Sequence, residues 1–157
     1  MPLANLAYLA AVDHPLTKEE WKSIKYFRPD EFSCKCAEHK NIPVYDMSSL
    51  LIYQLIRLRE LINIPIFITS GYRCEKYNAQ IGGEPNSAHI HKTAADITIS
   101  NPTFERLRDL YLACEHIGFR GLGFYPTRKI IHVDVMNRIQ RWLCNKDGKY
   151  IYFLVEG

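Results

Sequence analysis

The sequence lacks the features that mark membrane, repetitive and strongly charged proteins. It has no run approaching the roughly 20 apolar residues of a membrane-spanning helix, and no internal repeat or low-complexity linker. Neither sign of charge dominates, because 20 lysines and arginines stand against 17 aspartates and glutamates, a formal net charge of +3. Nucleic-acid-binding proteins usually carry a concentrated basic face. We therefore expect neither a nucleic-acid partner nor membrane insertion.

The N-terminal stretch 1–12 is apolar but has no lysine or arginine, and the first charged residue is Asp13. A Sec signal peptide begins with basic residues, which this stretch lacks. We therefore expect the stretch to pack on the domain, and the protein to be synthesised in the cytoplasm without such a signal.

No C-x-x-C pair occurs, and the cysteines are odd in number: Cys34, Cys36, Cys74, Cys114 and Cys144. This count argues against a complete disulfide framework and against a four-cysteine zinc site. Cys34, Cys36 and His39 are close enough to suggest a metal site, but their spacing is poor for structural zinc. Buried thiols are the favoured interpretation, and Cys114 falls on an apolar helical stripe that predicts a core position.

The composition and the local sequence patterns are those of an ordinary globular protein. The 157 residues are 47% hydrophobic and 24% charged, which predicts one domain over residues 1–157 with a core of its own. Thr17 and Glu20 form a capping box at the start of a helix. Longer helices are predicted over 47–62, with Asp46 as N-cap, and from Asn101-Pro102 to Gly118. Predicted strands cover 65–69, 94–99, 121–125, 130–135 and 150–155, with irregular chain over 26–45 and 70–93. Helices and strands mix without βαβ regularity, so we expect an α+β fold.

Two predicted strands carry polar residues opposite an apolar face. Ile131, Val133 and Val135 alternate with His132 and Asp134, so these two point away from the core. In the same way Asp96 points away from the buried face of its own strand. If the two strands pair, Asp96 and His132 approach each other, and His89 lies on the loop that leads into the first strand. Two histidines and one carboxylate with a free fourth position are a common catalytic zinc set. A hydrogen-bonded surface histidine and a capping aspartate are the alternatives for the single residues.

Four ordered segments resemble the M15 zinc peptidases. Residues 87–96, SAHIHKTAAD, resemble the family signature S-x-H-x-x-G-x-A-x-D, and residues 131–135, IHVDV, resemble its His-x-Asp strand. This second signature includes the preceding G-x-G-x-Y-P segment at 121–126. The third motif is the S-G-Y-R segment at 70–73, and the fourth is the entry motif EFSCKC at 31–36. Arg141-Trp142 follows the second histidine as in relatives, and the resemblance spans about residues 27–142.

The resemblance implies a LAS-type metallopeptidase fold: a small antiparallel sheet with helices on one face and Zn²⁺ on the other. It implies zinc held by His89, Asp96 and His132, and Arg73 orienting a substrate carboxylate or carbonyl; a surface ion pair is the alternative for Arg73. Asp134 is the best candidate for the catalytic carboxylate that accepts a proton from water. It could equally orient His132 through that residue's other ring nitrogen. Ser87 and His91 are candidate substrate contacts, and solvent exposure is the alternative for His91.

Two residues depart from the family pattern. Lys92 replaces the glycine of the first signature, and glycine is favoured where φ is positive or backbones approach closely. Lys129 stands where some branches place a catalytic carboxylate three residues before the second metal histidine.

The family contains D-Ala-D-Ala carboxypeptidases and phage-type L-alanyl-D-glutamate endopeptidases. We accordingly expect a monomeric zinc peptidase that hydrolyses peptidoglycan stem peptides and reaches the cell wall when released, in a phage or prophage context. One rival hypothesis is a non-catalytic wall-binding or virion component with a degraded site, which Lys92 and Lys129 would favour. Another is a zinc hydrolase of a small dipeptide.

Overall fold

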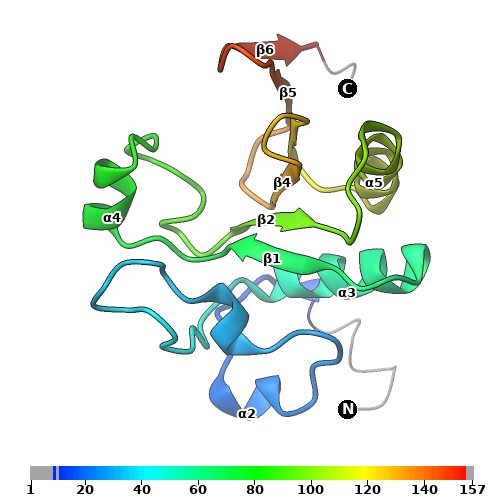
Figure 1. Ribbon diagram of the computed structural model, residues 1–157. Helices are drawn as coiled ribbons and strands as arrows, with labels where there is room; N and C mark the ends of the chain where they lie inside the picture. The colour runs from blue at the N-terminus through cyan, green and yellow to red at the C-terminus, as the bar shows by residue number, and fades with distance from the viewer. Residues whose placement is uncertain (1–8, 10, 155–157) are drawn as a thin grey trace.

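A single six-stranded sheet organises the molecule, with strand order β1-β2-β4-β3-β5-β6. The computed structural model describes residue 9 and residues 11–154 (Figure 1). The strands are β1 (Phe67–Ser70), β2 (Ala94–Thr98), β3 (Gly121–Tyr125), β4 (Ile130–Asp134), β5 (Gln140–Cys144) and β6 (Tyr150–Phe153). The helices are α2 (Lys18–Trp21), the 3-10 helix η2 (Pro29–Phe32), α3 (Ser49–Ile62), α4 (Glu75–Gln80) and α5 (Phe104–Ile117).

The α+β class is confirmed, but the expectation of a small, wholly antiparallel sheet needs correction. Strands β3 and β5 run parallel, while the other neighbouring pairs are antiparallel. Both edges of β4 are taken by β2 and β3, so β5 joins the free edge of β3. Because β3 and β5 both run opposite to β4, they lie parallel to each other.

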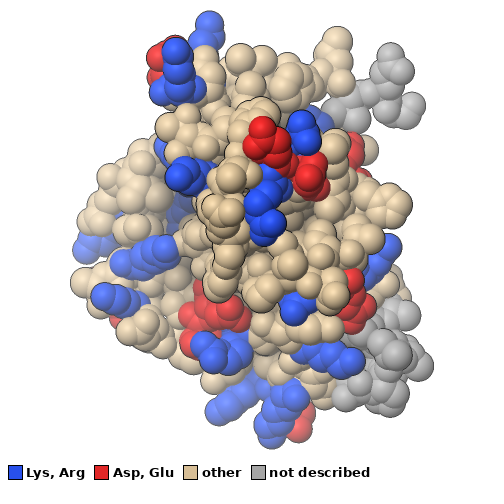
Figure 2. All heavy atoms as spheres, turned by 45° about the vertical axis from the view of Figure 1, so that its right-hand side comes forward, with Lys and Arg blue, Asp and Glu red and all other residues tan. Residues whose placement is uncertain are grey.

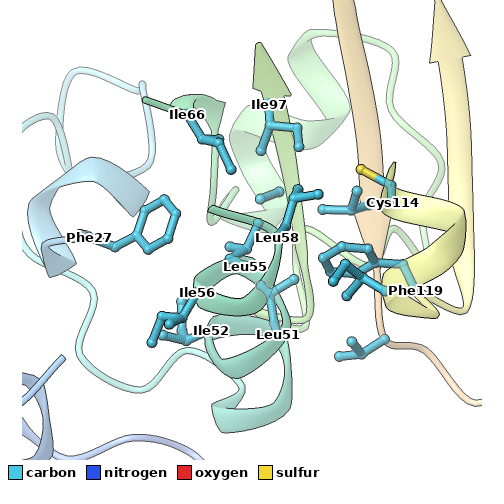
Figure 3. Close-up of a cluster of buried hydrophobic side chains, with 14 of the residues drawn as sticks. Phe27, Leu51, Ile52, Leu55, Ile56, Leu58, Ile66, Ile97, Cys114 and Phe119 are labelled. Carbon is cyan, nitrogen blue, oxygen red and sulfur yellow. The ribbon is translucent and has the colours of Figure 1, made fainter. Parts of the chain in front are cut away.

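The hydrophobic core lies between the sheet and the two long helices. Figure 3 shows Leu55 and Leu58 of α3 close to Ile97 of β2, with Cys114 and Phe119 beside them. All five of these side chains are fully buried. The predicted core position of Cys114 is therefore confirmed, and burial raises the pKa of its thiol far above the usual range. On β2 and β4 the apolar residues face this core, which leaves the opposite face of both strands for polar side chains.

The ends of the helices are set by their capping residues. The Thr17–Glu20 capping box at α2 is confirmed, as is the C-terminal Gly118 of α5, whose φ is +93°. Asp46 was a wrong N-cap prediction for α3, because Ser48 caps that helix and Asp46 binds Lys92 instead.

The predicted start of α5 at Asn101-Pro102 was also too early. Asn101 has a left-handed φ of 52°, and Thr103 accepts the hydrogen bond from Arg106 that caps the helix. A residue with positive φ cannot continue a right-handed helix, so α5 begins at Phe104.

Three elements were not predicted: α4, η2 and β5. Helix α4 has a single buried residue, Asn78, and therefore shows no apolar periodicity. Strand β5 begins with Gln140 and Arg141, which masked its strand pattern. The expectation for residues 1–12 falls mostly outside the described residues. Within the described part of the chain no helix has the length and apolar character needed to cross a bilayer.

The charged side chains are dispersed on the face seen in Figure 2. Lysine and arginine residues there lie among uncharged surface and beside aspartate and glutamate residues.

Candidate metal centre

One row of paired residues crosses the sheet and carries the candidate site. Ser70 pairs with Asp96, Asp96 with His132, His132 with Gly123, and Gly123 with Trp142. The predicted pairing that brings Asp96 to His132 is therefore confirmed. Paired residues in one row share a face of the sheet, and this face is the one opposite the core.

His89, Asp96 and His132 converge on one point. The Nδ1 atom of His132 lies 3.0 Å from Asp96 Oδ1, and the Nε2 atom of His89 lies 3.3 Å from the same oxygen. The two imidazole rings meet edge to face, with their centroids 5.1 Å apart. All three residues are buried. They also form a group whose potential ligand atoms lie within 4.8 Å of one another.

In each histidine, the ring nitrogen that faces away from this point contacts an oxygen atom of the protein. His89 Nδ1 lies 2.7 Å from the carbonyl oxygen of Gly71, and His132 Nε2 lies 2.8 Å from Asp134 Oδ2. A hydrogen bond donated by that nitrogen directs the lone pair of the opposite nitrogen toward the common point. The ligand atoms would then be Nε2 of His89, Nδ1 of His132 and a carboxylate oxygen of Asp96.

This donor set fits a zinc ion. His89 Nε2 is buried and has no hydrogen-bond partner within the described part of the chain, which is costly for a polar atom unless something else binds it. Ligands about 2.0–2.1 Å from a tetrahedral zinc ion lie about 3.3 Å apart. The separations of 3.0 and 3.3 Å around Asp96 Oδ1 agree with that spacing.

The charges around Asp96 and His132 stabilise each other in the absence of a metal. Burial alone would raise the pKa of Asp96, but the adjacent His89 and His132 hold it far below the usual range. Burial would likewise lower the pKa of His132, yet its hydrogen bonds to Asp134 and Asp96 raise that pKa to about 9. A bound cation would replace the proton on His132 as the partner of these carboxylates.

Asp134 is fully buried and its carboxylate is surrounded by donors. Arg138 donates to both oxygens, at 2.6 and 2.9 Å, and the Met136 amide donates to Oδ1 at 3.1 Å. Together with the bond from His132 these contacts hold the pKa of Asp134 well below its usual range, against the effect of burial. Gly121, paired with Asp134, leaves the space for this carboxylate, because a Cβ atom there would overlap it.

Arg73 lies at the edge of the triad. Its guanidinium contacts Asp96 Oδ2, Ser70 Oγ and Asn78 Oδ1, each at 3.4 Å. These contacts are long, and the side chain is 16% exposed. A guanidinium has five N–H donors, so Arg73 can hold Asp96 in place and still bind an incoming anion.

The other two candidate substrate contacts lie on the loop before β2. Ser87 Oγ accepts a hydrogen bond from the amide of His89, so this hydroxyl supports the backbone that carries the metal ligand. His91 is exposed and its Nε2 lies 2.7 Å from Asn86 Oδ1. A role in substrate binding for Ser87 and His91 stays a prediction.

The two departures from the family pattern lie in different surroundings. Lys92 has a φ of 61°, a left-handed conformation that a glycine would adopt without strain. Its ammonium group binds Asp46 at 2.6 Å and lies over the ring of Tyr72. Lys129 is exposed in the turn between β3 and β4, where its carbonyl accepts from Thr98.

Sequence reasoning missed three groups that support the site. They are Arg138, the Gly71 carbonyl and the Trp142 ring, which lies 5.1 Å from the ring of His132 and donates to Tyr125. The i,i+4 spacing of Asp134 and Arg138 was a signal that could have identified the first. Gly71 and Trp142 were noted only as parts of the family motifs, and their contacts with the two histidines join segments distant in the chain.

Comparison with known proteins supports the same assignment. The family model described as Peptidase M15 matches residues 25–134, which include Arg73, the three candidate metal ligands and Asp134. No curated protein matched the chain. The matched region covers well over half of the sequence and contains the whole buried donor set, so the chain belongs to the peptidase M15 family.

Proposed function

We propose that this peptidase depends on zinc and hydrolyses amide bonds in the stem peptides of peptidoglycan. The observation that carries the zinc proposal is the buried Nε2 of His89, which makes no well-directed hydrogen bond in the described part of the chain and lies against the same carboxylate oxygen as His132. The substrate class is supported by the four motifs shared with M15 enzymes. When bound, zinc supplies a Lewis acid that activates water and polarises the scissile carbonyl.

The residues of the chain have separate tasks in this proposal. His89, Asp96 and His132 hold the metal, and Arg73 binds the carboxylate or carbonyl of the peptide beside it. Arg73 is suited to this task because its donors form a planar fork that matches a carboxylate. The contact between Arg73 and Asp96 keeps that fork next to the metal ligands.

Asp134 is proposed to position His132 rather than to exchange protons with water. Both its oxygens are engaged by Arg138, one also by the Met136 amide and the other by His132. A carboxylate held in this way is a weak base, in keeping with its lowered pKa. Its charge stabilises His132 in the orientation that directs Nδ1 toward Asp96.

The alternative of a non-catalytic wall-binding domain with a degraded site rests on Lys92 and Lys129. Lys92 has a left-handed backbone, which glycine also adopts readily, and its side chain is bound to Asp46 and lies over the ring of Tyr72. Lys129 is in a surface turn and bonds through its carbonyl to Thr98, two residues beyond Asp96. Neither lysine displaces a member of the donor set, which favours the enzyme.

The test is release of new amino groups from purified peptidoglycan and from defined stem peptides, with products identified by mass spectrometry. The zinc-loaded protein should cleave, and His132→Ala should lose at least about 1,000-fold of that activity, since metal and polarisation are lost together. His116→Ala is the matched control, because His116 is exposed on α5 away from the donor set.

Two results would contradict the proposal. The first is zinc-loaded protein that releases no amine from any stem peptide while binding intact cell walls, which would support the wall-binding alternative. The second is His132→Ala with the activity of the unmodified protein.

A further inference from the structure

A second group of side chains that can bind metals lies outside the candidate metal centre, at the entry segment around residues 31–39. Cys34, Cys36, His39 and Cys74 place one potential ligand atom each within 4.8 Å of all the others. The Sγ atoms of Cys36 and Cys74 are 3.9 Å apart, and Cys36 Sγ is 2.9 Å from His39 Nδ1. We propose that these four residues bind a second zinc ion with a structural role. This proposal goes beyond the peptidase activity and does not depend on it.

The types and number of these side chains match closed structural zinc sites. Three thiolates and one imidazole in a tetrahedron are a common structural set, whereas catalytic sites keep one position open. With zinc–sulfur bonds of about 2.3 Å, the sulfur atoms of a tetrahedral site lie about 3.8 Å apart. The separation of 3.9 Å between Cys36 and Cys74 is close to that value.

Backbone contacts bring the two halves of the group together. The Tyr72 amide donates to the Phe32 carbonyl at 2.9 Å, which joins the chain just before Cys34 to the chain just before Cys74. Gly71 permits this approach, because a Cβ atom there would overlap the backbone of Phe32. The fold itself therefore aligns the two segments.

Amide groups also point at two of the sulfur atoms. The Cys74 amide lies 3.3 Å from Cys34 Sγ, and the Tyr77 amide lies 3.4 Å from Cys74 Sγ, at the start of α4. Donors of this kind stabilise the negative charge of a coordinating thiolate and hold its orientation.

The segment between Cys34 and Val44 is held by backbone hydrogen bonds within its turns and by an exposed ion pair between Glu38 and Lys76, and not by buried side chains. None of residues 35–43 is buried, and the segment forms no helix or strand, only turns. Figure 1 shows this cyan loop reaching toward α4, and Cys36 and His39 line one pocket with Cys74 and Tyr77. A metal bound by both segments would supply the cross-link that a hydrophobic core does not provide here.

The experiment measures metal content and the absorption spectrum of the full-length protein. Purified protein should contain about two zinc ions per chain, one in the three-residue catalytic site and one in the four-residue entry-segment group. After exchange with cobalt(II) it should show the near-ultraviolet charge-transfer absorption that thiolate ligands give. The His89–Asp96–His132 site has no sulfur ligand, so this absorption reports on the cysteine group alone.

Paired variants separate the two sites. Cys36→Ser should retain about one zinc ion and lose the thiolate absorption, and its peptidase activity should persist because the catalytic donors are intact. His132→Ala should also retain about one zinc ion but keep the absorption. Cys144→Ala is the matched control, since Cys144 lies on β5 outside the group and should change neither quantity.

Three outcomes would overturn the second site. They are unmodified protein without thiolate absorption after cobalt exchange, Cys36→Ser with unchanged zinc content, or a Cys36–Cys74 disulfide in protein isolated under reducing conditions. None of them bears on the peptidase proposal, which the peptidoglycan assay tests separately.

Discussion

The contacts of the Asp134 carboxylate support the proposed role of positioning His132. The sequence left two roles open, a base for water or a partner for His132. The structure surrounds this carboxylate with Arg138, the Met136 amide and His132. A base needs a lone pair facing the substrate, and these donors occupy the available positions.

Replacing Asp134 with asparagine tests this role. The amide keeps an acceptor for His132 but loses the charge, so zinc affinity should fall about 10–100-fold. At saturating zinc the kcat should stay within a few-fold of the unmodified protein. A general base would behave differently, because its loss typically costs about 100–10,000-fold in kcat even with the metal bound. Zinc titration combined with kinetics at saturating zinc separates the two roles.

The backbone of Lys92 has a conformation that residues with a Cβ atom rarely adopt. A non-glycine residue in the left-handed region is strained by about 1–2 kcal/mol, and Lys92 has a φ of 61°. Its ion pair with Asp46 is half exposed and offsets only part of this strain.

We expect Lys92→Gly to be more stable than Lys92→Ala by about 1 kcal/mol, because both lose the same side-chain contacts and only glycine relieves the strain. The free energy of unfolding in urea measures this difference. Equal stability of the two variants would show that the backbone at this position is not strained.

At the scale of the elements, β3 and β4 form a pair in which a small residue faces a large polar one. Gly121 lies opposite Asp134, and Gly123 lies opposite His132. The G-x-G part of the second motif therefore has a steric cause, since Gly121 provides space for the carboxylate that holds His132 and Gly123 provides space for the ring of Trp142.

Gly121→Ala should displace the Asp134 carboxylate, weaken zinc binding and lower the free energy of unfolding by about 1–3 kcal/mol. In an Asp134→Ala background the same substitution should cost much less, because the overlapping group has been removed. A double-mutant cycle measured by urea unfolding gives the coupling. Additive effects of the two substitutions would contradict the steric explanation.

At the scale of the whole molecule, the charges of the candidate metal centre make the free energy of unfolding depend on pH and on metal binding. In metal-free protein the pKa of His132 is raised from 6.5 to about 9 by Asp134 and Asp96, against the effect of burial. A raised pKa means that the ion pairs of His132 contribute fully below pH 6.5 and are lost as the pH rises through about 9. Zinc needs the neutral ring, so it competes with this proton.

Metal-free Cys36→Ser protein, in which the entry-segment group is disabled, should therefore lose stability between pH 6.5 and about 9. Over the same window the stabilisation by added zinc should increase, because fewer protons have to be displaced. Urea unfolding with and without zinc across this range checks both trends. A zinc effect that is the same at both ends of the window would contradict the linkage.

Local sequence patterns predicted the parts of this protein that depend on neighbouring residues. Alternation along the chain placed His132 and Asp134 on one face and Ile131 and Val133 on the other, because side chains of a strand alternate. It did not reveal α4, which has too few apolar residues to show a period, or β5, whose apolar residues are consecutive rather than alternating. The N-cap of α3 was misplaced by two residues because Asp46 and Ser48 are both capping residue types.

The sequence by itself determined the α+β class, the M15 family and the three residues of the candidate metal centre. These follow from short-range order in the chain and from motifs that occur within about ten residues. Only the tertiary structure decided that Asp134 is enclosed by donors, that β3 and β5 run parallel, and that Cys74 joins Cys34, Cys36 and His39. Cys74 is distant in the chain from Cys34, Cys36 and His39, and the direction of β5 depends on how the strands pair, so neither leaves a local pattern in the sequence. The donors to Asp134 lie within four residues of it, but only the folded backbone turns them toward its carboxylate.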